Sequence, residues 1–146
     1  MNRILSKFSL IIAMGLVTAG AWAQSPTGSL KATIPFDFTV NNTIVPAGTY
    51  MVSSENYRGH IVLLSNPAEK TRMFGVTVPE SAKRGQRNAL VFHKYGDRYF
   101  LSEIRCNGCA INSSLPVTKA EQWAKVHALD TADIPVVESD VLIALK

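Results

Sequence analysis

The sequence has few of the residues from which metal centres and nucleophilic active sites are built. Its 146 residues include two cysteines and three histidines. The histidines have no metal-like spacing to the cysteines, and haem attachment requires a histidine directly after the second cysteine, where Ala110 stands. His93 has no serine or carboxylate near it in sequence with a recognisable nucleophile motif, and a packed side chain explains it. We therefore expect no catalytic residue, no cofactor and no metal.

Long apolar runs are also scarce, and the chain has one. It spans residues 8–19, follows a short basic start with Arg3 and Lys7, and precedes Ala21-Trp22-Ala23, whose small residues suit a signal peptidase. The run is shorter than the roughly 20 residues of a membrane-spanning helix. We expect a signal peptide at 1–23 with cleavage after Ala23, periplasmic or secreted localisation, and no transmembrane segment in the mature chain.

Charge of one sign is limited as well. The formal net charge of +4 includes both leader cations, so 13 of the 15 Lys and Arg remain against 11 Asp and Glu. No basic stripe interleaved with aromatic residues follows, which argues against nucleic-acid binding. One cationic cluster, formed by Lys83, Arg84 and Arg87, predicts a solvated loop in preference to an anion site.

A period of two dominates the rest of the chain. Residues 30–40 alternate apolar and polar side chains over their whole length, although Pro35 lacks an N–H group and places this strand at an edge or at a bulge. Further short strands are expected at 49–53, 60–65 and 71–78 and in a hairpin at 89–105. The pattern predicts a flexible N-terminus at 24–29 and a single all-β domain at 30–146, a mainly antiparallel sandwich or small barrel.

The hairpin at 89–105 is the centre of this prediction. Gly96 and Asp97 form a two-residue loop that suits a type II′ turn, because glycine takes positive φ without steric cost. A constant register then has five cross-strand pairs: Tyr95 with Arg98, His93 with Phe100, Phe92 with Leu101, Val91 with Ser102, and Ala89 with Ile104. Both faces are largely apolar, so we expect both to be covered.

The C-terminal part changes to a helical pattern. Thr118 and Glu121 have the spacing of a capping box, and apolar residues follow at helical intervals. We expect one short helix at about 118–129 that packs Trp123 on the sheet. Residues 141–145, from Val141 to Leu145, are apolar enough for a last strand.

The two cysteines flank an Asn-Gly pair, which is a strong turn signal. An exported chain meets an oxidising environment, so Cys106 and Cys109 are expected to form a disulfide across this turn. If the turn is a two-residue hairpin, the two cysteines are directly paired at a distance that a disulfide tolerates. The alternative is a thiol-disulfide redox protein, whose cysteines normally lie at a helix N-terminus.

Aromatic and arginine side chains suggest a contact surface. Tyr57, Arg58, Tyr95 and Arg98 could gather on it, although Tyr95 and Arg98 also suit a local cation–π pair. Such a surface would serve an unidentified envelope protein or ligand, and a homo-oligomer is compatible with it.

Three segments resemble one family. Residues 32–50 (ATIPFDFTVNNTIVPAGTY), 90–103 (LVFHKYGDRYFLSE) and 115–121 (LPVTKAE) are similar to small secreted β-rich proteins of uncharacterised function from Acidobacteria-type bacteria. The resemblance implies no activity, cofactor or catalytic residue, and the cysteine pair does not belong to the family's pattern.

These observations predict an exported, non-enzymatic β domain that acts as a binding or structural module of the cell envelope. Two alternatives stay open. A small apolar-ligand-binding β-barrel would enclose a cavity lined by phenylalanines, and a redox protein would expose a reactive thiol at Cys106 or Cys109. An interaction module would instead show an exposed apolar patch or an unpaired edge, such as that of the strand at 30–40.

Overall fold

The computed structural model describes residues 29–54, 60–109, 111–131 and 139–146. The expected signal peptide at 1–23 lies outside the described residues, as do most of the N-terminus at 24–29, Tyr57 and Arg58. The described residues are mostly β-strand, with one helix near the C-terminus, which confirms the predicted fold class. The elements, in order, are β1 (Leu30–Ile34), β2 (Phe38–Val40), β3 (Thr43–Val45), β4 (Gly48–Ser54), β5 (Ile61–Asn66), β6 (Thr71–Val76), β7 (Val78–Pro79), β8 (Ala89–Tyr95), β9 (Arg98–Arg105), β10 (Ser113–Ser114), α1 (Lys119–Thr131) and β11 (Ser139–Ala144).

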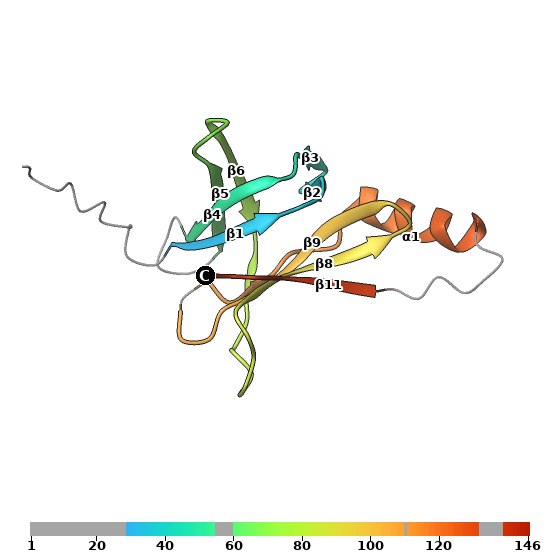
Figure 1. Ribbon diagram of the computed structural model, residues 1–146. Helices are drawn as coiled ribbons and strands as arrows, with labels where there is room; N and C mark the ends of the chain where they lie inside the picture. Colours follow the sequence, from blue (N-terminus) through green and yellow to red (C-terminus); the bar gives the residue numbers. More distant parts are fainter. Residues whose placement is uncertain (1–28, 55–59, 110, 132–138) are drawn as a thin grey trace, which may run out of the picture.

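The strands form two sheets around one core (Figure 1). The first sheet has the order β1-β4-β5-β6, and the second has the order β11-β8-β9-β10-β7, with β2 paired to β9 and β3 paired to β2. All of these pairings are antiparallel except that of β2 with β9. β8 and β9 lie inside the second sheet, as the apolar faces of the hairpin predicted.

Pro35 divides the strand that the alternation predicted over residues 30–40. β1 ends at Ile34 and β2 begins at Phe38 in the other sheet. The carboxylate of Asp37 accepts a hydrogen bond from the N–H of Ala47 at 2.8 Å and fixes this corner. Burial alternates with a period of two in β1, whereas all three residues of β2 are buried, so the segment supplies buried side chains to both sheets.

Backbone contacts join the two sheets at both sides. At one side, Lys31 N donates to Lys146 O at 2.8 Å and Lys146 N donates to Lys31 O at 3.0 Å. At the other side, Thr77 connects β6 directly to β7, which pairs with β10 in the second sheet. The architecture therefore lies between a sandwich and a closed ring of strands, and the expected open edge at β1 is partly covered by the C-terminus.

The central hairpin follows the predicted register near its turn and departs from it further away. Gly96 has φ of 59°, as a type II′ turn requires, and the pairs from Tyr95–Arg98 to Phe92–Leu101 are confirmed. A β-bulge then inserts Ser102 as an extra residue in β9. The Ser102 hydroxyl donates to Val91 O at 3.1 Å. The predicted pairs Val91–Ser102 and Ala89–Ile104 are consequently wrong, since Val91 pairs with Glu103 and Ala89 with Arg105.

The core between the sheets is built on aromatic rings. Phe38 makes edge-to-face contacts with Tyr50 and Phe92 at centroid distances of 5.5 and 5.4 Å. The Tyr50 hydroxyl donates to Pro46 O at 2.7 Å. Burial raises the pKa of this phenol above its usual 10.0, because the charged form would lose its hydration. Phe38 therefore joins two other buried rings at the centre of the core.

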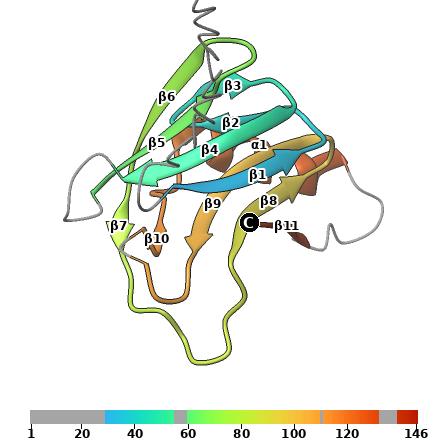
Figure 2. The same cartoon turned by 60° about the vertical axis from the view of Figure 1, so that its left-hand side comes forward.

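Helix α1 covers the opposite face of the hairpin, so β8 and β9 lie between α1 and the first sheet (Figure 2). Thr118 Oγ1 accepts from the N–H of Glu121 at 3.3 Å, which is half of the predicted capping box. Ala120, Ala124 and Ala128 face the sheet. The expectation that Trp123 packs on the sheet is wrong, since its side chain is 56% exposed. Alanines at a spacing of four bring the helix close to the hairpin and turn the larger ring outward.

Candidate functional site

The outer face of β5, β6 and β7 carries a row of exposed apolar side chains. Phe74 and Val76 on β6 are 55% and 62% exposed, and Ile61 and Val78 extend the row on the neighbouring strands. Ile61 pairs with Val76 across the two strands, which places their side chains on the same face. Exposed apolar residues that stand alone are ordinary, but adjacent ones on one sheet face mark a contact surface. We call Ile61, Phe74, Val76 and Val78 the β6 row.

β6 also ends its sheet, so its second edge is not paired with another strand among the described residues. The N–H of Thr77 donates to His60 O at 2.9 Å, which shows that odd-numbered residues of this strand point their backbone groups at β5. Arg72, Phe74 and Val76 therefore point theirs away from β5. The side-chain amide of Asn41 donates to Phe74 O at 3.1 Å and occupies one of these outward groups.

The β6 row and the β6 edge share Phe74 and Val76, and Arg72 lies beside them on the same strand. Arg72, Phe74 and Val76 supply outward side chains and outward backbone groups together, because both alternate with a period of two. Arg72 is exposed and places a positive charge at one end of the row. The arrangement offers main-chain hydrogen bonds, apolar side chains and one cation to an extended segment.

Two of the four residues of the predicted contact surface, Tyr95 and Arg98, lie among the described residues. Tyr95 is 5% exposed and packs against Phe100 and Ala124, so it cannot contribute to a surface. The guanidinium of Arg98 lies over the ring of Phe100 at 5.2 Å and that of Trp123 at 5.8 Å. Arg98 thus has its cation–π contacts with other rings than the expected one.

His93 has a partner that the sequence did not indicate. Its Nδ1 lies 2.7 Å from the carboxylate of Glu121, whose side chain is 5% exposed, and its Nε2 lies 3.9 Å from Asp140 Oδ1. A buried carboxylate requires such a partner. The pair joins α1 to β8, residues that are 28 positions apart. Among the described residues, no group of three or more His, Cys, Asp or Glu could hold a metal ion.

The predicted disulfide between Cys106 and Cys109 is confirmed, with their Cα atoms 5.7 Å apart. Gly108 has φ of 83° and makes the turn between them. The turn does not join two directly paired strands, because β9 ends at Arg105 and β10 begins only at Ser113. Cys106 is buried in the core, and the pair lies in a loop between strands, where no helix dipole acts on the sulfur atoms.

Asn112 holds the disulfide loop against the cationic loop that precedes β8. Its side-chain oxygen accepts from Cys106 N at 3.0 Å and from the Gln86 side chain at 3.3 Å. Its side-chain nitrogen donates to Glu80 O at 2.9 Å. One side chain therefore connects the end of β9 to two points of the loop that precedes β8, and no local sequence pattern indicates this role.

No protein-family model matches this chain, and no match was found among curated proteins or solved structures. Within the described ranges, no helix combines the length and apolar character that crossing a membrane requires.

Proposed function

We propose that this chain is an exported, non-enzymatic binding module of the cell envelope, and that the β6 row with its open edge is its binding surface. The observation that carries the proposal is that Phe74 and Val76 combine exposed apolar side chains with outward backbone groups, with the exposed Arg72 beside them on the same edge. Addition of a strand to a sheet edge uses both features, the backbone for affinity and alternate side chains for specificity. Export itself rests on the predicted signal peptide, and the family resemblance stays a prediction.

The partner that fits is an extended apolar segment of an envelope protein. A strand that pairs with β6 presents every second side chain to the β6 row, so these positions should be apolar or aromatic. An acidic residue at the end that meets Arg72 would complement its charge. A globular partner without an exposed strand could cover the apolar side chains but not the backbone groups.

The two alternative functions have less support from the geometry. The buried ring of Phe38 contacts Tyr50 and Phe92 in the interior, where an apolar ligand would have to bind. Burial of Cys106 restricts the attack that a redox mechanism requires.

A synthetic peptide provides the test. Ten residues that alternate valine or phenylalanine with threonine and end in aspartate are titrated into the purified chain, and backbone amide shifts are followed by NMR. We expect saturable shifts along β6, and loss of binding in the double variant Phe74→Ser/Val76→Ser. The matched control is Val126→Ser, which removes a similarly exposed valine from α1 and should bind as the parent chain does.

Three results would contradict the proposal. They are the absence of saturable shifts, shifts that map to α1 or the disulfide loop, and equal loss of binding in the control variant. The variant Arg72→Glu should bind the aspartate peptide more weakly and a peptide that ends in lysine more tightly. This comparison tests the charge of the partner separately from the position of the binding surface.

A further inference from the structure

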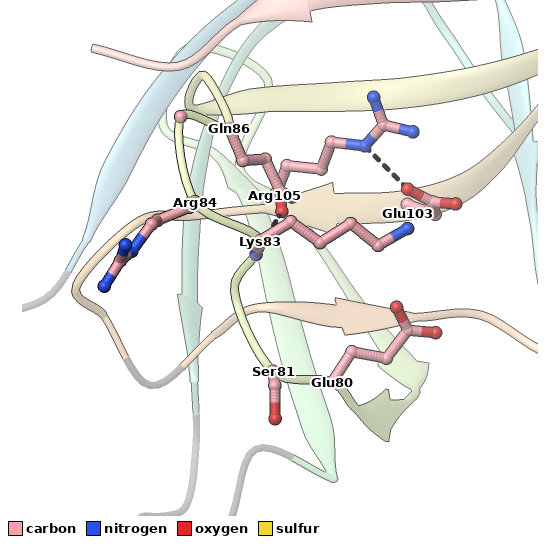
Figure 3. Close-up of a pocket in the computed structure, with 8 residues that line it drawn as sticks. Glu80, Ser81, Lys83, Arg84, Gln86, Glu103 and Arg105 are labelled. Carbon is pink, nitrogen blue, oxygen red and sulfur yellow. Dashed lines mark hydrogen bonds and ion pairs between the residues drawn. The ribbon is translucent and has the colours of Figure 1, made fainter.

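A second surface feature lies beside the loops that Asn112 connects. A pocket of about 270 Å³ opens between the loop that follows β7 and the end of β9. Loop residues from Glu80 to Gln86 form one wall, and Glu103 and Arg105 form the other (Figure 3). The volume is just below the about 300 Å³ at which pockets for drug-sized molecules begin, so it suits a ligand of monosaccharide size.

The loop wall is held in shape by its own hydrogen bonds. The side chain of Gln86 accepts from Lys83 N at 2.9 Å, and Gln86 N donates to Lys83 O at 3.1 Å. Through Asn112 the same glutamine is tied to the loop that carries the disulfide. A ligand that enters this pocket would not have to order the loop, which lowers the cost of binding.

The charged side chains of the pocket differ in whether they form an ion pair. Arg105 Nε donates to Glu103 Oε2 at 2.7 Å, which leaves the remaining N–H donors of the guanidinium for other acceptors. Within the part of the chain that the structure describes, no ion pair engages Lys83. Figure 3 shows its ammonium on the side of the Arg105–Glu103 pair, the Glu80 carboxylate across from it, and Arg84 directed away.

We propose that this pocket binds a small hydroxylated oxyanion, of the class of sugar acids and sugar phosphates. The anionic group would meet the Lys83 ammonium, since charge-assisted hydrogen bonds are the strongest available here. The hydroxyls would donate to the Glu80 carboxylate. The pocket is distinct from the β6 row, and it adds a second ligand class to the proposed envelope module.

The test is an NMR titration of the purified chain with sodium glucuronate and with glucose 6-phosphate at low ionic strength. Two control ligands are glucose, which has the hydroxyls without an anionic group, and inorganic phosphate, which has the anionic group without the sugar. We expect both acidic sugars to give saturable shifts at Gln86, Glu103 and Arg105, and glucose to give none. Lys83→Gln should raise Kd by about tenfold or more. Arg87→Gln removes the same charge from the same loop outside the pocket and should change Kd less than about twofold.

The two acidic sugars distinguish the carboxylate from the phosphate form of the ligand. Absence of saturable shifts with both would overturn the proposal, as would equal loss of affinity in the Arg87 variant, which would indicate attraction to general charge. Inorganic phosphate that binds as tightly as glucose 6-phosphate would overturn the role of Glu80 and the hydroxyls. None of these results depends on the β6 row.

Discussion

The hairpin of β8 and β9 separates two regions that are stabilised in different ways. On one face lies the large core shared by both sheets, where Phe38 contacts both Tyr50 and Phe92 and burial dominates. On the other face, Tyr95 and Phe100 pack against alanines of α1, Lys125 of α1 lies over the Tyr95 ring, and the buried Glu121 carboxylate binds His93. Burial of apolar area scales with side-chain size, so alanines contribute little of it. The sheets therefore depend on packing, whereas the helix depends strongly on one polar pair.

The largest expected effect is in the large core. Phe92→Ala removes a fully buried ring that contacts Phe36 and Phe38, and should lower the free energy of unfolding by about 3–5 kcal/mol. Urea denaturation of the parent chain and the variant measures this loss. Phe74→Ala is the control, because it truncates an exposed phenylalanine and should cost less than about 0.5 kcal/mol. Similar losses for both variants would mean that burial does not decide the stability of the sheets.

The helix is expected to respond to loss of its polar pair. Glu121→Ala removes the partner of His93 and should destabilise the attachment of α1 by about 1–3 kcal/mol. Amide hydrogen exchange should accelerate in α1 and remain unchanged in β5 and β8, because the opening is local. Exchange that accelerates equally throughout the chain would show that the helix and the sheets unfold together.

A smaller effect is expected from the disulfide. The double variant Cys106→Ser/Cys109→Ser opens a loop of four residues and should cost about 2 kcal/mol or less. Thermal melts with and without reductant on the parent chain give the same comparison. A loss as large as that of Phe92→Ala would contradict the view that the disulfide fixes only its loop and the neighbouring Asn112.

The smallest expected effect is the contribution of Tyr50 ionisation to the free energy of unfolding, which changes with pH only in alkaline solution. Its pKa is raised in the folded chain, so the neutral phenol stabilises the fold below about pH 10 and this contribution is lost as the unfolded chain begins to ionise. Urea denaturation should therefore show stability falling above pH 10, and less steeply in Tyr50→Phe. Equal slopes in the two proteins would assign the fall to other groups.

The sequence predicted the fold where a local pattern determines the structure. The alternation, Pro35, the Gly96 turn and the capping residue Thr118 each depend on a few neighbouring residues. The β2–β3 hairpin was missed, although Asn41 and Asn42 have φ of 47° and 66°, as its two-residue turn requires. Asparagine is one of the few residues other than glycine that adopt such angles, so the Asn-Asn pair was the available signal.

Other features depend on contacts between distant residues and left no local signal. The bulge at Ser102 moves Ile104 to the face of Leu90, and a constant register cannot foresee it. The pairing of His93 with Glu121 and the three contacts of Asn112 follow from packing of separate elements. The sequence predicts β6 as a strand but does not indicate which of its two faces is covered, so the exposed apolar row had no local signal.

Residue-resolved amide hydrogen exchange in β6 of the unbound chain tests the proposed binding surface most directly. An open edge predicts alternation: the amide protons of Met73 and Gly75, which point at β5, exchange slowly, whereas those of Arg72, Phe74 and Val76 exchange fast. Addition of the apolar peptide should then slow the fast set. Uniform protection along β6 in the unbound chain would contradict the account, because it would mean that the edge is already covered.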